Sequence, residues 1–223
     1  MIDVLVTELL EGPALDDLSK QFHVELQPEL WKSPDELRAK VADCRALLIR
    51  NQTRVTRDLL NGGSRLEIVA RAGAGLDNVD VDAATEAGIL VTSAPEQNAI
   101  SVAELTMGMM LALARKIAGA DRSTKDGNWD RNRFTGSELF GKTVGIVGFG
   151  RIGFLVAMRA RAFGMRVLAY DPYASRDSVT VIESGASIVP IGELLNKSDV
   201  VSVHLPGNSA TRQFFNRERL GMM

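Results

Sequence analysis

Residues 144–153 have the sequence VGIVGFGRIG, in which an apolar run leads into three glycines spaced Gly-x-Gly-x-x-Gly. An apolar run of this kind is typical of a parallel strand that is buried on both faces. Gly148 would then permit the tight turn after the strand, Gly150 would leave room for a pyrophosphate, and Gly153 would let the next helix approach closely. The stretch therefore predicts a strand, a turn and a helix that together bind a dinucleotide.

The residues that follow the glycines support this prediction. Residues 151–162 have the composition of a helix, whose first-turn N–H groups and dipole would favour a diphosphate. Asp171 ends the next apolar run, at residues 167–170, and follows Gly148 by 23 positions. A carboxylate about 20 residues after the first glycine accepts hydrogen bonds from the ribose hydroxyls and disfavours a 2′-phosphate. We therefore expect NAD as the cofactor, although Arg176 nearby leaves NADP open.

The composition is that of an ordinary globular protein. With 223 residues, of which 45% are hydrophobic, the chain can bury a sizeable core in one large or two small domains. A net charge of −2 without a long basic run argues against nucleic acid and anionic membranes as partners. The single cysteine, Cys44, cannot form an internal disulfide, which together with a nucleotide cofactor favours the cytoplasm. The longest uncharged apolar stretch, residues 105–114, is about half of a membrane span, so we expect no transmembrane helix.

Short strand-like runs alternate with helical patterns along the whole chain. This alternation predicts an α/β fold with parallel sheets and helices on both faces. We expect two doubly wound domains: a flavodoxin-like substrate domain at residues 1–99 and an incomplete Rossmann NAD-binding domain at residues 100–223. The strands are expected at residues 4–6, 23–26, 46–49, 66–69, 89–91, 144–147, 167–170, 187–189 and 200–204.

Two capping boxes predict where helices begin. Residues 33–36, SPDE, place a serine before a proline at the first helical position and a glutamate three residues after the serine. Residues 101–104, SVAE, have the same serine and glutamate spacing. The second box predicts the start of one long helix over residues 101–119, which would join the two domains.

The first domain has two polar segments where its strands are expected to end. Arg50 and Asn51 follow one strand, and residues 71–80, RAGAGLDNVD, follow the next. Open α/β sheets bind ligands at the carboxyl ends of their strands, and a loop of small residues exposes N–H groups that can hold a carboxylate. Arg50 and Arg71 beside such a loop indicate an anionic substrate. The sequence contains no metal-binding motif.

The motifs taken together resemble those of the NAD-dependent D-2-hydroxyacid dehydrogenase family, and within it the branch that acts on 3-phosphoglycerate. The resemblance runs through most of the chain, and several motifs in order are more specific than any one of them. It implies an NAD-dependent oxidoreductase that acts on the CH–OH group of a 2-hydroxy acid, with a role in serine biosynthesis. The motifs that carry it are residues 50–53, 71–80, 98–104, 125–131, 134–153 and 204–206.

The resemblance also implies the roles of individual residues. Residues 101–140 correspond to the dimer-forming segment, so a homodimer is expected. The loop amides would face the substrate carboxylate, and the two arginines suit a phosphate, in a substrate site of Arg50, Asn51, Arg71, Gly73, Ala74 and Gly75. The implied cofactor site contacts the diphosphate, the ribose and the adenosine through Ala74, Gly148, Gly150, Arg151, Ile152, Gly153, Asp171, His204, Leu205 and Pro206.

The family's catalytic arginine, acid and histidine would follow Met223, so we expect no catalytic residue within this sequence. We reject His204 as the base, because the resemblance places it beside the adenosine half of the cofactor and a base must lie within about 3.2 Å of the proton it takes. The sequence is therefore expected to be a fragment of a longer enzyme with little activity by itself. The alternative is a noncatalytic, NAD-responsive binding protein of the same fold, and the downstream reading frame distinguishes the two. A methyltransferase with a similar glycine loop has no support from the first domain.

Overall fold

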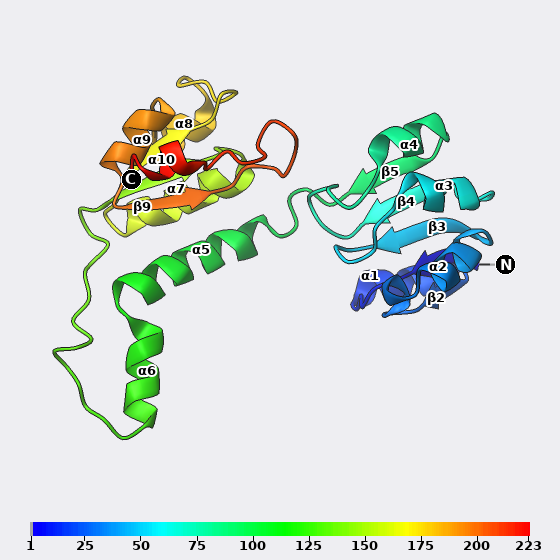
Figure 1. Ribbon diagram of the computed structural model, residues 1–223, viewed down its shortest axis with the longest axis horizontal. Coiled ribbons are helices and arrows are strands. Elements are labelled where there is room, and N and C mark those ends of the chain that lie inside the picture. The colour runs from blue at the N-terminus through cyan, green and yellow to red at the C-terminus, as the bar shows by residue number, and fades with distance from the viewer. Residues whose placement is uncertain (1) are drawn as a thin grey trace. The chain divides into compact units, whose positions relative to one another are not determined.

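Figure 1 shows the computed structural model, which describes residues 2–223. The chain folds as two compact units, unit 1 at Met1–Gln97 and unit 2 at Asn98–Met223. Each unit has one sheet in which all paired strands are parallel. This confirms the predicted fold class of two parallel-sheet α/β structures.

Unit 1 has a five-stranded sheet in the order β2-β1-β3-β4-β5, which is the flavodoxin-like order. Its core consists of apolar side chains from the central strands and the helices, among which Leu5, Leu47 and Val69 are fully buried. The elements are β1 (Ile2–Val6), α1 (Pro13–Gln21), β2 (Val24–Leu26), the 3-10 helix η1 (Leu30–Lys32), α2 (Pro34–Val41), β3 (Cys44–Ile49), α3 (Arg57–Gly62), β4 (Ile68–Arg71), α4 (Val81–Glu86) and β5 (Leu90–Ser93).

Unit 2 has a four-stranded sheet in the order β8-β7-β6-β9. Numbered from β6, this order is 3-2-1-4, which is the arrangement of the first four strands of a Rossmann fold. Every residue of β6 is buried, as its apolar sequence predicts. The elements are α5 (Ala99–Ala114), α6 (Ile117–Lys125), β6 (Thr143–Val147), α7 (Arg151–Ala162), β7 (Arg166–Tyr170), α8 (Val179–Ser184), β8 (Ser187–Ile188), α9 (Ile191–Lys197), β9 (Val200–Val203) and α10 (Arg217–Leu220).

The structure corrects both predicted capping boxes. Helix α2 begins at Pro34 as predicted, but the Ser33 side chain makes no capping hydrogen bond. Ser33 also ends the preceding 3-10 helix, where its N–H donates to the carbonyl of Leu30. Helix α5 begins at Ala99, so Ser101 lies inside the helix and cannot cap it.

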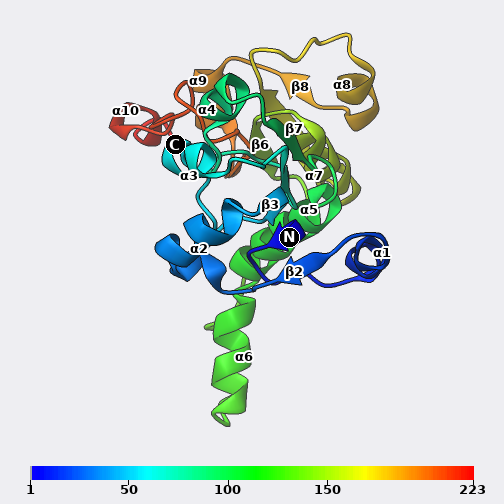
Figure 2. The ribbon, with the colours of Figure 1, turned by 90° about the vertical axis from the view of Figure 1, so that its right-hand side faces the viewer.

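The single long helix predicted over residues 101–119 is also wrong. Helix α5 ends at Ala114, and Lys116 adopts a left-handed conformation with φ of 53° before α6 begins. The Ala114 carbonyl accepts a hydrogen bond of 2.9 Å from the Ser137 N–H, and Gly136 packs directly against it. A returning segment thus occupies the end of α5. Figures 1 and 2 both show α6 projecting at an angle from that end.

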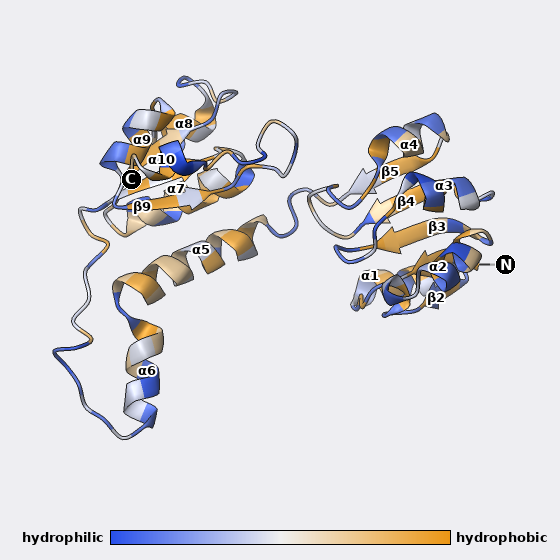
Figure 3. Ribbon diagram, viewed as in Figure 1, coloured by the Kyte–Doolittle hydropathy of each residue, from blue (hydrophilic) through white to orange (hydrophobic). Residues whose placement is uncertain are grey.

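The apolar residues are concentrated in the strands, as Figure 3 shows for β3 and β4. Helix α5 is also apolar along most of its length, and it packs against α7 within unit 2. No helix within residues 2–223 is both long enough and apolar enough to cross a membrane.

Candidate functional site

The register of the sheet in unit 2 brings three loops together at one edge. Val147, the last residue of β6, pairs with the last residues of β7 and β9. Gly148, Asp171 and His204 are the residues that follow these three strand ends. Three segments that are far apart in the sequence therefore begin side by side at the carboxyl edge of the sheet.

The three glycines of the turn have different surroundings. Gly148 has a φ of 96°, and a Cβ there would lie 2.6 Å from the carbonyl oxygen of His204. A Cβ on Gly153 would overlap the carbonyl oxygen of Gly148. At Gly150, by contrast, a Cβ would have no atom within 4 Å. The turn is thus tight at its first and third glycines and open at the second.

Helix α7 begins directly after this open position. The Phe154 N–H donates to the Gly150 carbonyl at 3.0 Å, which is the first hydrogen bond of the helix. Within residues 2–223, the N–H groups of Arg151, Ile152 and Gly153 donate no hydrogen bond, and no side chain caps the helix. Unpaired amides at the positive end of a helix dipole bind anions, so these residues fit the diphosphate of a dinucleotide.

The Asp171 carboxylate is held in place by two backbone donors. Its Oδ2 accepts from the Phe149 N–H at 2.8 Å, and its Oδ1 accepts from the Tyr173 N–H at 2.8 Å. A carboxylate has about four acceptor positions, so each oxygen can still accept from a ribose hydroxyl. The sequence predicted the contact with ribose but not the hydrogen bond to the glycine turn.

His204 begins the loop after β9. Its backbone N–H donates to the Val147 carbonyl at 2.7 Å, and its Nε2 lies 2.9 Å from the Ser202 Oγ. Burial lowers the pKa of His204, which favours the neutral imidazole. Leu205 follows and is partly buried in an apolar cluster with Tyr170 and Phe214. Pro206, the last residue predicted for the adenosine side, is exposed.

The candidate substrate residues of unit 1 lie near its topological switch point. In the order β2-β1-β3-β4-β5, the connections from β1 and β3 leave the sheet in opposite directions, and open α/β sheets bind ligands at such a point. A cavity of about 380 Å³ is found there, with a lining from the segment after β1, from Arg50 after β3 and from Ala72 after β4.

Glu8 is a residue of this site that the sequence did not reveal. It follows β1, is only 4% exposed, and its two carboxylate oxygens accept from four consecutive backbone N–H groups at 2.8–3.1 Å. These donors belong to Arg50, Asn51, Gln52 and Thr53. Burial opposes ionisation, but the backbone donors outweigh it and lower the pKa of Glu8. A glutamate at the end of a buried strand was the signal that could have identified it.

The two candidate arginines are placed differently. Arg50 lines the cavity, and its Nη1 donates to the Leu9 carbonyl at 3.1 Å. Arg71 is only 10% exposed, because its Nε donates to the Arg50 carbonyl and its Nη1 pairs with Asp77, both at 2.9 Å. Asn78 also donates from Nδ2 to the Arg50 carbonyl, at 3.0 Å. Arg71 and Asn78 therefore support the backbone that presents Arg50.

The glycine loop after β4 offers two amides. The Gly73 N–H already donates to the Arg71 carbonyl at 2.9 Å. In the described part of the chain, the N–H groups of Ala74 and Gly75 donate no hydrogen bond. A Cβ on Gly75 would lie 2.8 Å from the Arg71 Nη1, so the arginine and the loop pack closely. The Asn51 side chain is exposed beside this edge, and its N–H is taken by Glu8.

Comparison with protein families identifies the second half of the chain. Residues 107–223 match the family described as D-isomer specific 2-hydroxyacid dehydrogenase, NAD binding domain. The chain belongs to this family. The match covers more than half of the chain and confirms both the resemblance seen in the sequence and the prediction of an NAD-binding domain.

Individual relatives are similar over the whole chain. The D-3-phosphoglycerate dehydrogenase of Methanocaldococcus jannaschii is 46% identical over 225 residues, which cover 100% of this chain and 42% of the relative. Among solved structures, the TT0316 protein from Thermus thermophilus is 35% identical with a TM-score of 0.90, over 100% of this chain and 70% of that one. D-lactate dehydrogenase from Aquifex aeolicus, solved with NAD and lactic acid, is 31% identical with a TM-score of 0.88. The match covers 99% of this chain and 66% of that one. The chain spans about two fifths of the length of the curated relative.

Proposed function

We propose that the protein is an NAD-dependent oxidoreductase that interconverts the CH–OH group of a 2-hydroxy acid and the corresponding keto acid. One observation supports this proposal most strongly. Residues 107–223 match the family's NAD-binding domain, and their glycine turn has open space at Gly150 next to unpaired backbone amides. The name of the 46% identical relative makes 3-phosphoglycerate the first substrate to test. Residues 1–99 would form the substrate domain and residues 100–223 the cofactor domain.

The cofactor would bind along the carboxyl edge of unit 2. The amides of Arg151, Ile152 and Gly153 hold the diphosphate, and the open position at Gly150 gives it access to the backbone. The free acceptor positions of Asp171 bind the ribose hydroxyls and select NAD over NADP, while residues 204–206 line the adenosine side. NAD supplies the hydride acceptor, and the residues of this chain bind and orient it.

The substrate would bind at the cavity of about 380 Å³ in unit 1. The free amides of Ala74 and Gly75 suit the substrate carboxylate, because two adjacent N–H groups can donate to its two oxygens. Arg50 supplies a positive charge for a phosphate at the other end of the substrate. Glu8 and Arg71 fix the backbone of both segments, so the binding groups are ordered before the substrate arrives.

A homodimer through residues 101–140 is supported by apolar side chains that lie on the surface. Leu105, Met109 and Leu113 are spaced four residues apart on α5 and are 62%, 57% and 77% exposed. Trp129 and Phe140 are similarly exposed. Such a stripe marks a surface that packs against another protein. The one free cysteine, Cys44, is buried and suits a cytoplasmic enzyme.

The test uses the full-length gene product. We expect NADH to bind with saturable quenching of protein fluorescence, and NAD to be reduced when 3-phosphoglycerate is added. D-lactate and D-glycerate serve as unphosphorylated comparisons. Cofactor binding without turnover of any 2-hydroxy or keto acid would favour the noncatalytic binding protein. Absence of NADH binding at millimolar concentration would reject the proposal altogether.

A further inference from the structure

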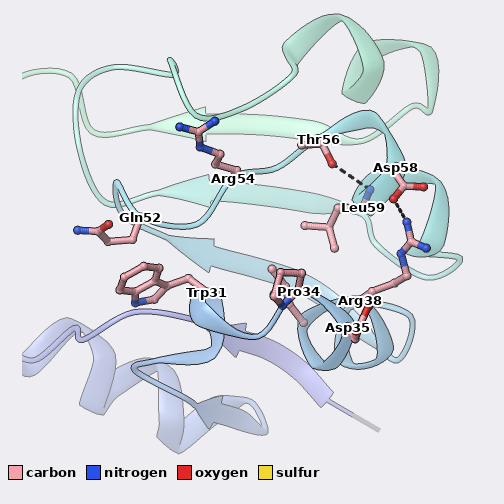
Figure 4. A pocket seen from close by; sticks show the side chains of 10 residues that line it. Trp31, Pro34, Asp35, Arg38, Gln52, Arg54, Thr56, Asp58 and Leu59 are labelled. Carbon is pink, nitrogen blue, oxygen red and sulfur yellow. Dashed lines mark hydrogen bonds and ion pairs between the residues drawn. The ribbon is translucent and has the colours of Figure 1, made fainter.

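A second and larger cavity of unit 1 is lined by none of the residues assigned above to the substrate. It has a volume of about 680 Å³ and lies between α2 and α3, with Trp31 of η1 and the segment after β3 completing its lining (Figure 4). Cavities of about 300–1,000 Å³ are the size of small-molecule sites. The cavity is large enough for a ligand, and its lining indicates which kind.

Arg54 is the unpaired cation of this cavity. Unit 1 has seven arginines. Among residues 2–97, Arg54 is the one arginine whose side chain makes neither an ion pair nor a hydrogen bond. Ion pairs hold Arg38, Arg45, Arg57, Arg65 and Arg71, and a backbone carbonyl holds Arg50. An arginine left free in a cavity lining can bind a carboxylate or phosphate.

The backbone that carries Arg54 is fixed on both sides. Thr53 is fully buried, its N–H donates to Glu8, and its carbonyl accepts from Asn78 Nδ2 at 2.7 Å. On the other side, the Val55 N–H donates to the Asn78 carbonyl, and the Val55 carbonyl accepts from Asp80, both at 2.8 Å. The free side chain therefore projects from an ordered segment, which reduces the entropy lost when it binds a ligand.

The other lining groups add an apolar surface and further polarity. Figure 4 shows Trp31, Gln52 and Arg54 at one end of the cavity, and the Arg38–Asp58 ion pair at the other. Asp35 also lines the cavity, so its two arginines and two aspartates balance in charge. Arg38 and Asp58 pair with each other, which leaves Arg54 as the arginine available to an anionic ligand. Trp31 is half-buried, and the Lys32 Nζ lies 5.4 Å from the centroid of its ring.

We propose that this groove binds a small anion that carries a planar apolar body. The planar body stacks on Trp31, the anionic group pairs with Arg54, and the Gln52 amide donates a further hydrogen bond. Aromatic carboxylates and aryl phosphates both have this chemistry. The proposal concerns unit 1 by itself and does not depend on the dehydrogenase activity.

The test is a titration of the ¹⁵N-labelled chain with benzoate, followed through the indole N–H signals. The chain has two tryptophans, and Trp129→Phe assigns the two signals. We expect the Trp31 signal to shift saturably while the Trp129 signal stays in place. Arg54→Gln should weaken benzoate binding about tenfold, the size expected for one charge-assisted contact. The matched control, Arg45→Gln, removes an arginine that pairs with Glu67 and should leave benzoate affinity unchanged.

Phenyl phosphate, benzyl alcohol and inorganic phosphate separate the contribution of the ligand's charge from that of its aromatic ring. Phenyl phosphate should bind like benzoate, whereas the alcohol lacks the charge and phosphate lacks the ring, so both should bind at least about fivefold more weakly. The proposal is overturned if benzoate leaves the Trp31 signal in place, or if Arg54→Gln binds it as well as the unmodified chain. Competition between benzoate and 3-phosphoglycerate would also overturn it, because Arg54 would then belong to the substrate site.

Discussion

The backbone N–H of Phe149 donates a hydrogen bond of 2.8 Å to the carboxylate of Asp171. Phe149 is the residue between the first two glycines of the turn, and Asp171 follows the neighbouring strand. The group proposed to bind ribose therefore also fixes the turn proposed to bind the diphosphate. A substitution at position 171 should affect both parts of the cofactor.

We predict that Asp171→Ala weakens NADH binding about 10- to 100-fold, because it removes charge-assisted hydrogen bonds of about 1.5–3 kcal/mol and releases the glycine turn. The same variant should also show a weaker preference for NAD over NADP. Asp171→Asn keeps one acceptor oxygen and should lose less affinity. Fluorescence titration of the full-length protein with NADH and NADPH measures both effects, with the exposed Asp177→Ala as control. An unchanged ratio of the two affinities in the alanine variant would count against the role of Asp171.

The glycines of the turn give a matched pair of substitutions. Gly150→Ala should fold normally, because its Cβ would meet no atom within 4 Å, but it should weaken NADH binding by narrowing access to the backbone. Gly153→Ala should instead destabilise unit 2 by at least about 1–3 kcal/mol, since its Cβ would overlap the Gly148 carbonyl oxygen. Thermal unfolding and NADH titration distinguish the two. Equal loss of stability in both variants would contradict the finding that a side chain has room at Gly150 and none at Gly153.

The sequence predicted the strands and the glycine turn well because both depend on local patterns. Burial on both faces gives β6 a continuous apolar sequence, and the turn requires glycine where a side chain would overlap the backbone. The end of α5 was mispredicted because a contact with Ser137, 23 residues further along the chain, determines it. Glu8 follows an apolar run, which was a local signal, but its partners begin 42 residues away, so its hydrogen bonds could not be predicted from that pattern alone.

Glu8→Gln tests whether this carboxylate orders the substrate segment. The glutamine oxygen can replace one pair of N–H partners, but its NH₂ group faces the other pair, which costs about 1–3 kcal/mol for buried donors left unsatisfied. We expect unit 1 to unfold at lower urea concentration, as reported by Trp31 fluorescence in a Trp129→Phe background. The exposed Glu11→Gln is the control. Similar unfolding midpoints for the two glutamine variants would show that Glu8 contributes little.

The same variant should change the pH dependence of stability. The pKa of Glu8 is lower in the folded chain than its ordinary value, because the backbone donors outweigh the opposing effect of burial. Its contribution is therefore complete above the unfolded pKa and is lost as the pH falls through the folded pKa. Urea unfolding at about pH 7 and about pH 4 should show a difference between Glu8→Gln and the unmodified chain that shrinks at the lower pH. A difference that grows on acidification would contradict the direction of the pKa shift.

Arg50 and Arg71 should respond differently to substitution. Arg50 lines the cavity, so Arg50→Ala should raise the KM for 3-phosphoglycerate about 10- to 100-fold and the KM for D-lactate much less. Arg71 holds the Arg50 carbonyl and Asp77, so Arg71→Gln should lower stability and raise both KM values together. Steady-state kinetics of the full-length protein give the KM of each variant for both substrates. A selective effect of Arg71→Gln on the phosphorylated substrate would mean that Arg71 binds the phosphate directly.

The apolar stripe on α5 gives a test of the proposed dimer. Leu113 is 77% exposed at the end of the stripe, so Leu113→Glu should leave the fold intact but place a charge in the contact between subunits. Because an unpaired charge is costly to bury, we expect the dimer to dissociate at least about 100-fold more readily. Sedimentation velocity over a range of concentrations measures this. Leu90→Glu, at a 63% exposed leucine of unit 1, is the control, because a charge there lies outside residues 101–140. If both variants remain dimers with unchanged affinity, the subunits associate through another surface and the stripe on α5 has a different role.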